Sequence, residues 1–242
     1  MFDLSETKIL TFEIGARCNL EKVHKKCPIN SRIAHQEFGS LSIPDVVKAV
    51  QEAKELNFKG AVAFHYYNEP LLYRDKMLAI MDCLPDTKFL LWTNGLLLRS
   101  PENENDFLRR FYFIVITCYF PEMMPKFEML KEHFGNIEIG QWELDERKAI
   151  YTSEHKNHCG CHRMIHEIPI DYWGNLHLCC IDWNGTYQIG NIKQSGLGSV
   201  IRGEFYQKAV NSMYDDYLDE TNSPHICKMC PTPKLVSPFI IE

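Results

Sequence analysis

Four cysteines in the C-terminal third of the chain have the residue type and spacing of a metal centre. Cys227 and Cys230 are separated by two residues, so one tight turn presents both sulfurs to a single centre. Cys161 and Cys179 lie upstream and complete a set of four thiolates. Such a set holds either zinc or an iron–sulfur cluster, because both take soft sulfur ligands. The spacing alone leaves open a cluster, a structural zinc site and ordinary buried cysteines.

Neighbouring cysteines compete for places in this set. Cys159 lies two residues from Cys161, and Cys180 follows Cys179 directly, so Cys159 and Cys180 are alternative ligands. Two further cysteines, Cys83 and Cys118, have apolar surroundings in the sequence, and we expect both to be small core residues. We therefore expect the metal to be bound by Cys161, Cys179, Cys227 and Cys230.

The order of features around these cysteines resembles the SPASM or twitch-type region of radical S-adenosylmethionine (radical SAM) enzymes. A hairpin turn at Asp171–Asn175 precedes the cysteine pair 179–180, Gly190-Asn191 reads as a second turn, and Cys227-x2-Cys230 closes the segment. The resemblance covers roughly residues 158 to 232, and several spaced elements agree in order. It implies an auxiliary iron–sulfur cluster of the four-iron, four-sulfur type.

Composition sets limits on the partners and the compartment. The chain has 242 residues, a net charge of −6, 45% hydrophobic residues and 24% charged residues, as a globular protein does. The negative charge gives no general attraction to nucleic acid or to an anionic membrane. No apolar run approaches the ~20 residues of a membrane helix, and no signal peptide precedes the first strand. We expect a cytoplasmic protein whose ten cysteines stay reduced.

The first ~150 residues alternate between strand-like and helix-like segments, which favours a parallel sheet flanked by helices. Only five or six strands fit, whereas a complete eight-stranded barrel commonly needs ~250 residues, so we expect a partial, open β/α barrel. The expected domains are 1–155 for this barrel and 156–242 for the cluster region. The expected strands are Lys8–Ile14, Ala61–His65, Phe89–Trp92, Phe113–Thr117 and Ile137–Trp142, and the expected helices are Ile43–Leu56, Leu72–Leu84, one ending at Phe107–Phe111, and Phe127–Phe134.

Three strands end in segments whose residues could form a site, because the loops of a parallel sheet converge at its carboxyl edge. Gly15–Leu20 follows the first strand, residues 67–70 follow the second, and Thr93-Asn94-Gly95 follows the third. In order, they resemble the cluster loop, the Gly-Gly-Glu-Pro segment and the later strand-end residues of the radical SAM core. The resemblance implies that S-adenosylmethionine is bound by Tyr67, Asn68, Glu69, Pro70, Thr93 and Asn94.

The cluster loop departs from the pattern Cys-x3-Cys-x2-Cys that holds three irons in this family. Counting from Cys18, the two partners would fall on Lys22 and Lys25, which cannot serve. The loop instead reads Cys18-x5-His24-x2-Cys27. Either His24 is the third ligand beside Cys18 and Cys27, or the third thiolate comes from elsewhere and the site is altered.

The resemblance implies the chemistry of a radical SAM enzyme with two four-iron, four-sulfur clusters. Such an enzyme cleaves S-adenosylmethionine reductively and uses the 5′-deoxyadenosyl radical to abstract hydrogen from a substrate. A ribosomally synthesised peptide is the leading substrate, modified by crosslinking, epimerisation or backbone excision. A separate leader-binding protein would present this peptide, and flavodoxin or ferredoxin would supply electrons. No residue of the sequence stands out as a catalytic acid or base.

Two other functions remain open from the sequence. One is a radical SAM dehydrogenase acting on a sugar, an aminocyclitol or another small metabolite. The other is a non-catalytic zinc- or cluster-binding module descended from the enzyme. The bulky residues Phe64, His65, Tyr66, Tyr67 and Trp92 near the strand ends could line a pocket for an aromatic side chain, although such residues more often form a core.

Overall fold

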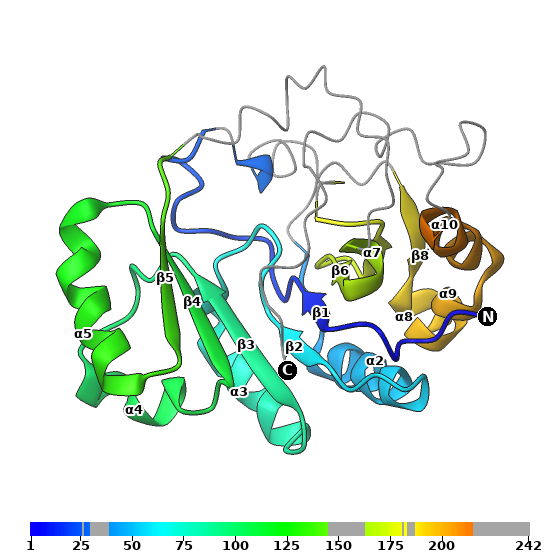
Figure 1. The fold of residues 1–242 in the computed structure, drawn as a ribbon, viewed down its shortest axis with the longest axis horizontal. Coiled ribbons are helices and arrows are strands. Elements are labelled where there is room, and N and C mark those ends of the chain that lie inside the picture. Colours follow the sequence, from blue (N-terminus) through cyan, green and yellow to red (C-terminus); the bar gives the residue numbers. More distant parts are fainter. Residues whose placement is uncertain (26, 30–38, 145–162, 181, 183–186, 215–242) are drawn as a thin grey trace.

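One continuous sheet of eight strands organises the protein, with strand order β5-β4-β3-β2-β1-β6-β7-β8 (Figure 1). The computed structural model describes residues 1–25, 27–29, 39–144, 163–180, 182 and 187–214. The first six strands of this order run parallel, which confirms the expected open barrel of five to six parallel strands. They are β1 (Ile9–Phe12), β2 (Ala61–Ala63), β3 (Lys88–Thr93), β4 (Phe113–Cys118), β5 (Ile137–Gln141) and β6 (Glu167–Ile170).

The sheet continues from the barrel into the segment expected to carry the auxiliary cluster. Strand β6 pairs with β1, whereas β7 (Asn175–His177) and β8 (Gln188–Asn191) are antiparallel. The predicted hairpin turn at 171–175 is confirmed by two backbone hydrogen bonds that close it. Gly190-Asn191 is not a turn. It ends β8, and the Asn191 side chain accepts hydrogen bonds from the amides of Lys193 and Gln194 to cap the next helix.

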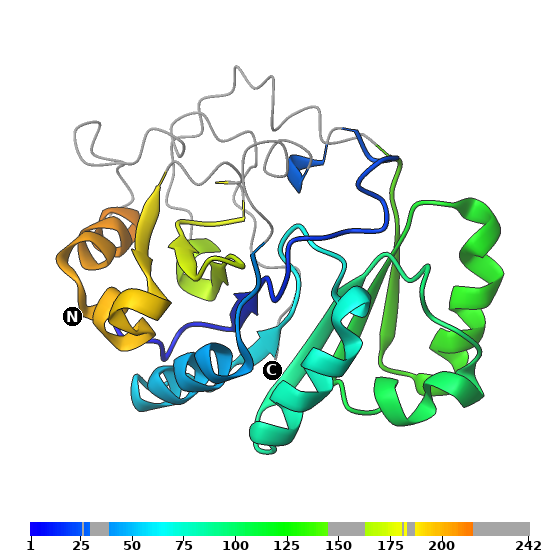
Figure 2. The same ribbon diagram turned by 180° about the vertical axis from the view of Figure 1, so that it is seen from behind.

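Helices cover the outer side of the parallel strands, and Figure 2 shows α2 and α3 lying across the back of them. Helix α2 begins where Ser42 and Asp45 form a capping box, with Pro44 in the first turn. Each helix expected before residue 142 is found, with bounds that differ by a few residues. The helical elements are α2 (Ile43–Glu55), η1 (Pro70–Tyr73), α3 (Arg74–Cys83), α4 (Pro101–Leu108), η2 (Pro121–Met123), α5 (Met124–Phe134), α7 (Arg163–His166), α8 (Ile192–Ser195), α9 (Leu197–Arg202) and α10 (Glu204–Tyr214).

Helices α9 and α10, which follow β8, pack against the N-terminal part of the chain. Helix α9 packs on α2, where the Gly198 amide donates a hydrogen bond of 2.9 Å to the Glu52 carboxylate. The Gln207 side chain on α10 exchanges two hydrogen bonds with the backbone of Phe2. None of the helices in the described ranges has the length and apolar character that a membrane span requires.

The two faces of the parallel strands differ in chemistry because successive side chains point to opposite sides. The outward residues, such as Leu10, Leu91 and Ile116, are buried with the helices in the main core. The opposite, inner face carries a small apolar cluster at the amino ends of the strands, made of Ile9, Ala61, Ala63 and Leu90 with Phe113. Polar side chains follow on the same face toward the carboxyl ends.

The two cysteines expected in the core have different positions. Cys118 is fully buried at the end of β4, as predicted. Cys83 is exposed, so that part of the prediction is wrong. The buried stripe of α3 consists of Met77, Ile80 and Met81, and Cys83 falls outside its helical spacing.

A glycine fixes the turn after β3 that carries two of the predicted site residues. Gly95 has φ 71°, and a Cβ atom there would lie 2.7 Å from Ile116 Cγ2 and 2.8 Å from the Phe127 ring. Both contacts belong to the main core, so neither neighbour can move away freely.

We predict that Gly95→Ala lowers the free energy of unfolding more than Gly135→Ala. Both glycines have positive φ, so both substitutions carry the left-handed backbone cost of about 1–2 kcal/mol. Only Gly95 adds overpacking, about 1–3 kcal/mol more, because nothing lies within 4 Å of a Cβ at Gly135. Chemical denaturation of both variants measures the difference, and equal losses would contradict this account.

Candidate active site

Three strand ends meet at the carboxyl edge of the sheet and are tied together by hydrogen bonds. The Glu69 amide donates to the Arg17 carbonyl over 2.9 Å, which joins the segment after β2 to the loop after β1. The Glu69 carboxylate accepts from Thr93 Oγ1 at 2.6 Å and from the Asn94 amide at 2.9 Å, which joins it to the end of β3. The convergence expected from the sequence is therefore present.

The Glu69 carboxylate accepts its hydrogen bonds from other groups of the protein. The side chain is buried, and its Oε1 atom also accepts from the Leu71 amide at 3.0 Å. Burial raises the pKa of Glu69, and the hydrogen bonds from Thr93, Asn94 and Leu71 oppose that shift. With three donors satisfied by the chain, the carboxylate braces the strand ends.

The loop with the first predicted cluster ligand lies against the end of β3. Asn94 Nδ2 donates to Asn19 Oδ1 at 2.7 Å and lies 4.0 Å from Cys18 Sγ. Arg17 forms an ion pair with Glu21 across one turn of this loop. These contacts hold Cys18 at the carboxyl edge, directly beside two residues predicted to bind the cofactor.

Two of the three predicted ligands share one environment. Cys27 is buried in a cluster with Tyr66 and Tyr67, and Cys18 packs against the same cluster. His24 is also buried, with its ring centroid 5.5 Å from that of Tyr119. Among the described residues, no three His, Cys, Asp or Glu side chains converge as metal ligands. The complete set of Cys18, His24 and Cys27 therefore stays a prediction.

The donors that are present suit a cluster. The described cysteines are all free thiols; Cys27 is buried and Cys18 is half-buried. Burial raises the pKa of the Cys18 thiol to about 12, with smaller contributions from Glu69 and Cys27. A buried thiol of this kind ionises when a metal binds, because the cation favours the thiolate.

The remaining predicted cofactor residues form a fixed turn after β2. Asn68 closes it, since its Oδ1 accepts from the Tyr66 amide and its Nδ2 donates to the Phe64 carbonyl. The Tyr67 amide donates to Glu13 Oε1 at 3.2 Å. Glu13 was not predicted as a site residue, although an acidic side chain inside the expected strand Lys8–Ile14 was a signal that could have found it.

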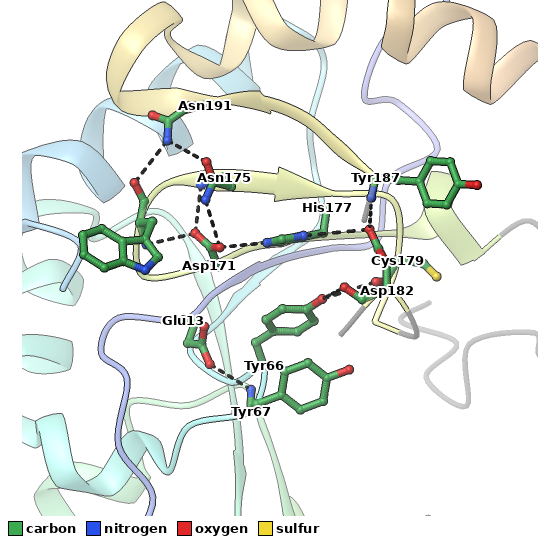
Figure 3. A network of polar contacts seen from close by, with 11 residues as sticks. Glu13, Tyr66, Tyr67, Asp171, Asn175, His177, Cys179, Asp182, Tyr187 and Asn191 are labelled. Carbon is green, nitrogen blue, oxygen red and sulfur yellow. Dashed lines mark hydrogen bonds and ion pairs between the residues drawn. The ribbon is translucent and has the colours of Figure 1, made fainter. Parts of the chain in front are cut away.

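A second polar network supports the cysteine pair 179–180 (Figure 3). His177 Nε2 lies 2.9 Å from Asp171 Oδ2, and its Nδ1 lies 4.0 Å from the carboxylate of Asp182. Burial alone would raise the pKa of Asp171, but the hydrogen bonds with His177 and Asn175 outweigh it and lower that pKa. Asp182 accepts from the Tyr187 amide at 2.9 Å. The network holds the chain on both sides of the pair, and the sequence did not predict it.

Two tyrosines connect this network to the barrel. Tyr66 donates from its hydroxyl to the carbonyls of Cys179 and Asp182, at 3.4 and 3.3 Å, and Tyr67 donates to the carbonyl of Cys180. Tyr66 also stacks on His177, with ring centroids 5.7 Å apart. The predicted cofactor segment and the predicted auxiliary cysteines are thus in direct contact.

Comparisons with known proteins agree with this arrangement. Residues 159–231 match the SPASM family, an iron-sulfur cluster-binding domain. The fold matches the crystal structure of BtrN in complex with AdoMet and 2-DOIA, with a TM-score of 0.67, 16% identity, and coverage of 87% of this chain and 88% of that one. The chain shares the fold of this structure, and its residues 159–231 match the SPASM domain.

A second structure shares the fold at a greater distance. It is anSMEcpe with bound AdoMet and Cp18Cys peptide, with a TM-score of 0.54, 12% identity, and coverage of 93% of this chain and 88% of that one. No curated protein sequence matches the chain. The predicted fold and iron–sulfur domain are confirmed, and the domain boundary at 155/156 stays a prediction.

The SPASM ligand set is only partly within the described residues. Cys179 is half-buried, and Cys180 accepts a hydrogen bond from the Arg163 guanidinium. Burial raises the pKa of the Cys180 thiol, Glu167 and Cys179 add to this, and Arg163 opposes it. The other predicted ligands and the alternative upstream cysteine lie outside the described residues: Cys161, Cys227, Cys230 and Cys159.

The inner face of the radical SAM barrel carries a polar group of its own. His65 Nε2 lies 3.9 Å from Glu167 Oε1, and Thr11 donates to the same oxygen at 3.3 Å. His65 Nδ1 is buried and has no hydrogen-bond partner among the residues that the structure describes, and its ring lies against Trp92 with centroids 5.0 Å apart. Burial lowers the pKa of His65 to about 4 and raises that of Glu167, where Arg163 opposes the shift.

The aromatic pocket considered from the sequence is divided among three environments. Phe64 belongs to the main core, Tyr66 and Tyr67 contact the cysteine loops, and only His65 and Trp92 share the inner face. A single aromatic pocket made of all five residues is therefore not formed.

We predict that Thr93→Val lowers the free energy of unfolding by about 1–3 kcal/mol, because it leaves the buried Glu69 carboxylate one donor short. Thr87→Val is the matched control, since the Thr87 hydroxyl has no hydrogen-bond partner and its loss should be close to neutral. Denaturation midpoints of the two variants test this. A Thr93 variant as stable as the wild-type protein would show that Glu69 does not brace the strand ends.

Proposed function

We propose that this chain is a radical SAM enzyme that abstracts a hydrogen atom from its substrate. The observation that carries the proposal is the convergence of the Cys18 loop, the Glu69 segment and Asn94 at the carboxyl edge of the parallel strands. Ligands of parallel α/β sheets bind at this edge. When bound, the reduced cluster supplies the electron that cleaves S-adenosylmethionine to methionine and a 5′-deoxyadenosyl radical.

The proposed enzyme has cluster ligands and cofactor-binding segments at separate positions of the chain. Cys18 and Cys27 hold the N-terminal cluster, and His24 is the candidate third ligand. The backbone of residues 67–70 and the end of β3 hold S-adenosylmethionine, with the Glu69 carboxylate keeping both segments in place. Cys179 or Cys180 contributes to the auxiliary four-iron cluster together with Cys161, Cys227 and Cys230.

A ribosomally synthesised peptide is the first candidate substrate. The same fold in anSMEcpe accommodates a bound peptide beside AdoMet, which supports a barrel of this size taking an extended chain. The proposed reaction is a modification of the peptide such as crosslinking, epimerisation or backbone excision. A leader-binding protein would present the peptide and flavodoxin or ferredoxin would supply electrons, in the cytoplasm.

A small hydroxyl- or amine-bearing metabolite is the second candidate, and the inner face favours it. Within the described ranges, His65 Nδ1 is a buried polar atom with no partner, and the Glu167 carboxylate beside it accepts one long hydrogen bond there, from Thr11. Buried polar groups normally find partners, so a ligand hydroxyl or amine would complete this pair. The substrate would then lose a hydrogen atom to the 5′-deoxyadenosyl radical, and the resulting substrate radical would lose a proton and pass one electron to the auxiliary cluster, which completes a two-electron oxidation to the carbonyl or imine.

We predict that Cys18→Ala and Cys27→Ala each abolish formation of 5′-deoxyadenosine, because removing either thiolate removes a ligand of the N-terminal cluster. The absorbance of the auxiliary cluster should persist in both variants. The measurement is product analysis after anaerobic reconstitution and reduction with dithionite. Cys83→Ala is the matched control, since this thiol is exposed and remote from the site. Unchanged turnover in both site variants would refute the proposal.

A second prediction distinguishes the two substrate classes. If the substrate is a hydroxyl- or amine-bearing metabolite, Glu167→Gln should raise its KM about 5- to 10-fold, because a neutral amide oxygen accepts a weaker hydrogen bond than a charged carboxylate does. Cleavage of S-adenosylmethionine without substrate should continue. Anaerobic assays with a panel of polyols and amino sugars, and separately with precursor peptides, measure this. Stimulation by peptides alone, with no effect of Glu167→Gln, would favour the peptide.

A further inference from the structure

Two adjacent tyrosines occupy the junction between the barrel and the SPASM domain. Tyr66 and Tyr67 follow β2 by three and four residues, and both are buried, with exposed fractions of 9% and 7%. Their rings contact each other at a centroid distance of 4.4 Å. The resembled family has a glycine at the position of Tyr67, so a phenol there is a feature of this chain.

The two hydroxyl groups reach the same short segment of the SPASM domain. Tyr66 contacts the carbonyls of Cys179 and Asp182, and Tyr67 contacts that of Cys180 (Figure 3). These bonds connect positions 113 to 116 residues apart in the sequence. Both carbonyls of the cysteine pair are therefore held from the barrel, whichever of the two sulfurs binds the cluster.

The backbone of the same tyrosines is fixed from the other side. The Tyr67 amide donates to Glu13 on the loop after β1, and the Tyr66 amide donates to the Asn68 side chain. Glu69, which follows Asn68, is hydrogen-bonded to the cluster loop and to the end of β3. A shift of the segment 67–70 would therefore be transmitted through rigid aromatic side chains to the cysteine pair.

Contacts of this kind change the properties of a metal centre. Hydrogen bonds around the ligands of an iron–sulfur cluster, and the position of the ligands themselves, set its reduction potential. A phenol that fixes a ligand carbonyl restricts where the sulfur lies, although the phenol does not touch the metal. Tyr66 and Tyr67 satisfy this condition for both candidate ligands.

We propose that Tyr66 and Tyr67 are positioning residues that couple the S-adenosylmethionine segment to the auxiliary cluster. Binding of S-adenosylmethionine to the backbone of residues 67–70 changes the reduction potential of the auxiliary cluster through the hydrogen bonds that the two phenol groups donate. This inference rests on the proposed function, since it requires both sites in one enzyme. It assigns the two tyrosines a role that a glycine-containing segment cannot perform.

The test measures the midpoint potential of the auxiliary cluster in the reconstituted enzyme, with and without S-adenosylmethionine. Electron paramagnetic resonance monitors the reduction of the cluster. The wild-type potential should shift when S-adenosylmethionine is added. Tyr67→Phe and Tyr66→Phe should each lose at least half of this shift, and the double variant should lose it. Tyr112→Phe is the matched control, because Tyr112 is exposed and its ring contacts Lys88 instead of either site.

The outcomes separate this inference from the proposed function. If a variant binds as much iron as the wild-type enzyme, the phenylalanine substitution has preserved the fold. If the double variant binds less iron, the two single variants alone test the coupling. A wild-type potential that ignores S-adenosylmethionine, or variants that keep the full shift, would overturn the coupling even where 5′-deoxyadenosine still forms. Absence of 5′-deoxyadenosine from the wild-type enzyme would instead remove the proposed function.

Discussion

One buried carboxylate joins the three strand ends on which the candidate site depends. Glu69 accepts hydrogen bonds from Thr93, Asn94 and Leu71, while its amide holds the carbonyl of Arg17 in the cluster loop. Burying a carboxylate is costly unless donors satisfy it, so these segments are fixed together or the site is not formed. Glu69 therefore acts on the site through its neighbours, by determining where the backbone of each segment lies.

The sheet supplies the frame for this arrangement because it separates two kinds of chemistry. Its outer face is apolar and packs on α2 to α5, which leaves the inner face free for polar residues such as His65 and Glu167. Strand β6 extends the same sheet beside β1, and the SPASM domain thereby begins as part of the barrel. The cysteine pair 179–180 reaches the strand ends through this shared sheet and through the two tyrosines that follow β2.

Features that depend on local sequence could be predicted, and contacts across long separations could not. The alternation of apolar segments with helices predicted five of the six parallel strands, all except β6, and motif spacing located the Cys18 loop, the segment 67–70 and the SPASM domain. The contact of Tyr67 with Cys180 spans 113 residues, and no local pattern reports it. Glu167 was missed for the same reason, since its neighbours Thr11 and His65 lie on β1 and after β2.

The unusual length of the cluster loop is not itself an obstacle to a metal site. The family pattern places its outer cysteines seven residues apart, and here Cys27 is nine residues from Cys18. Because the entropy of loop closure grows only logarithmically, two added residues cost about 0.2 kcal/mol. The packing of Cys27 and the half-buried Cys18 against Tyr66 and Tyr67 shows that the loop still returns to the strand ends. What the longer loop changes is the identity of the third ligand. An imidazole from His24 would raise the potential of that cluster relative to a thiolate, and so would make the electron transfer to S-adenosylmethionine more demanding.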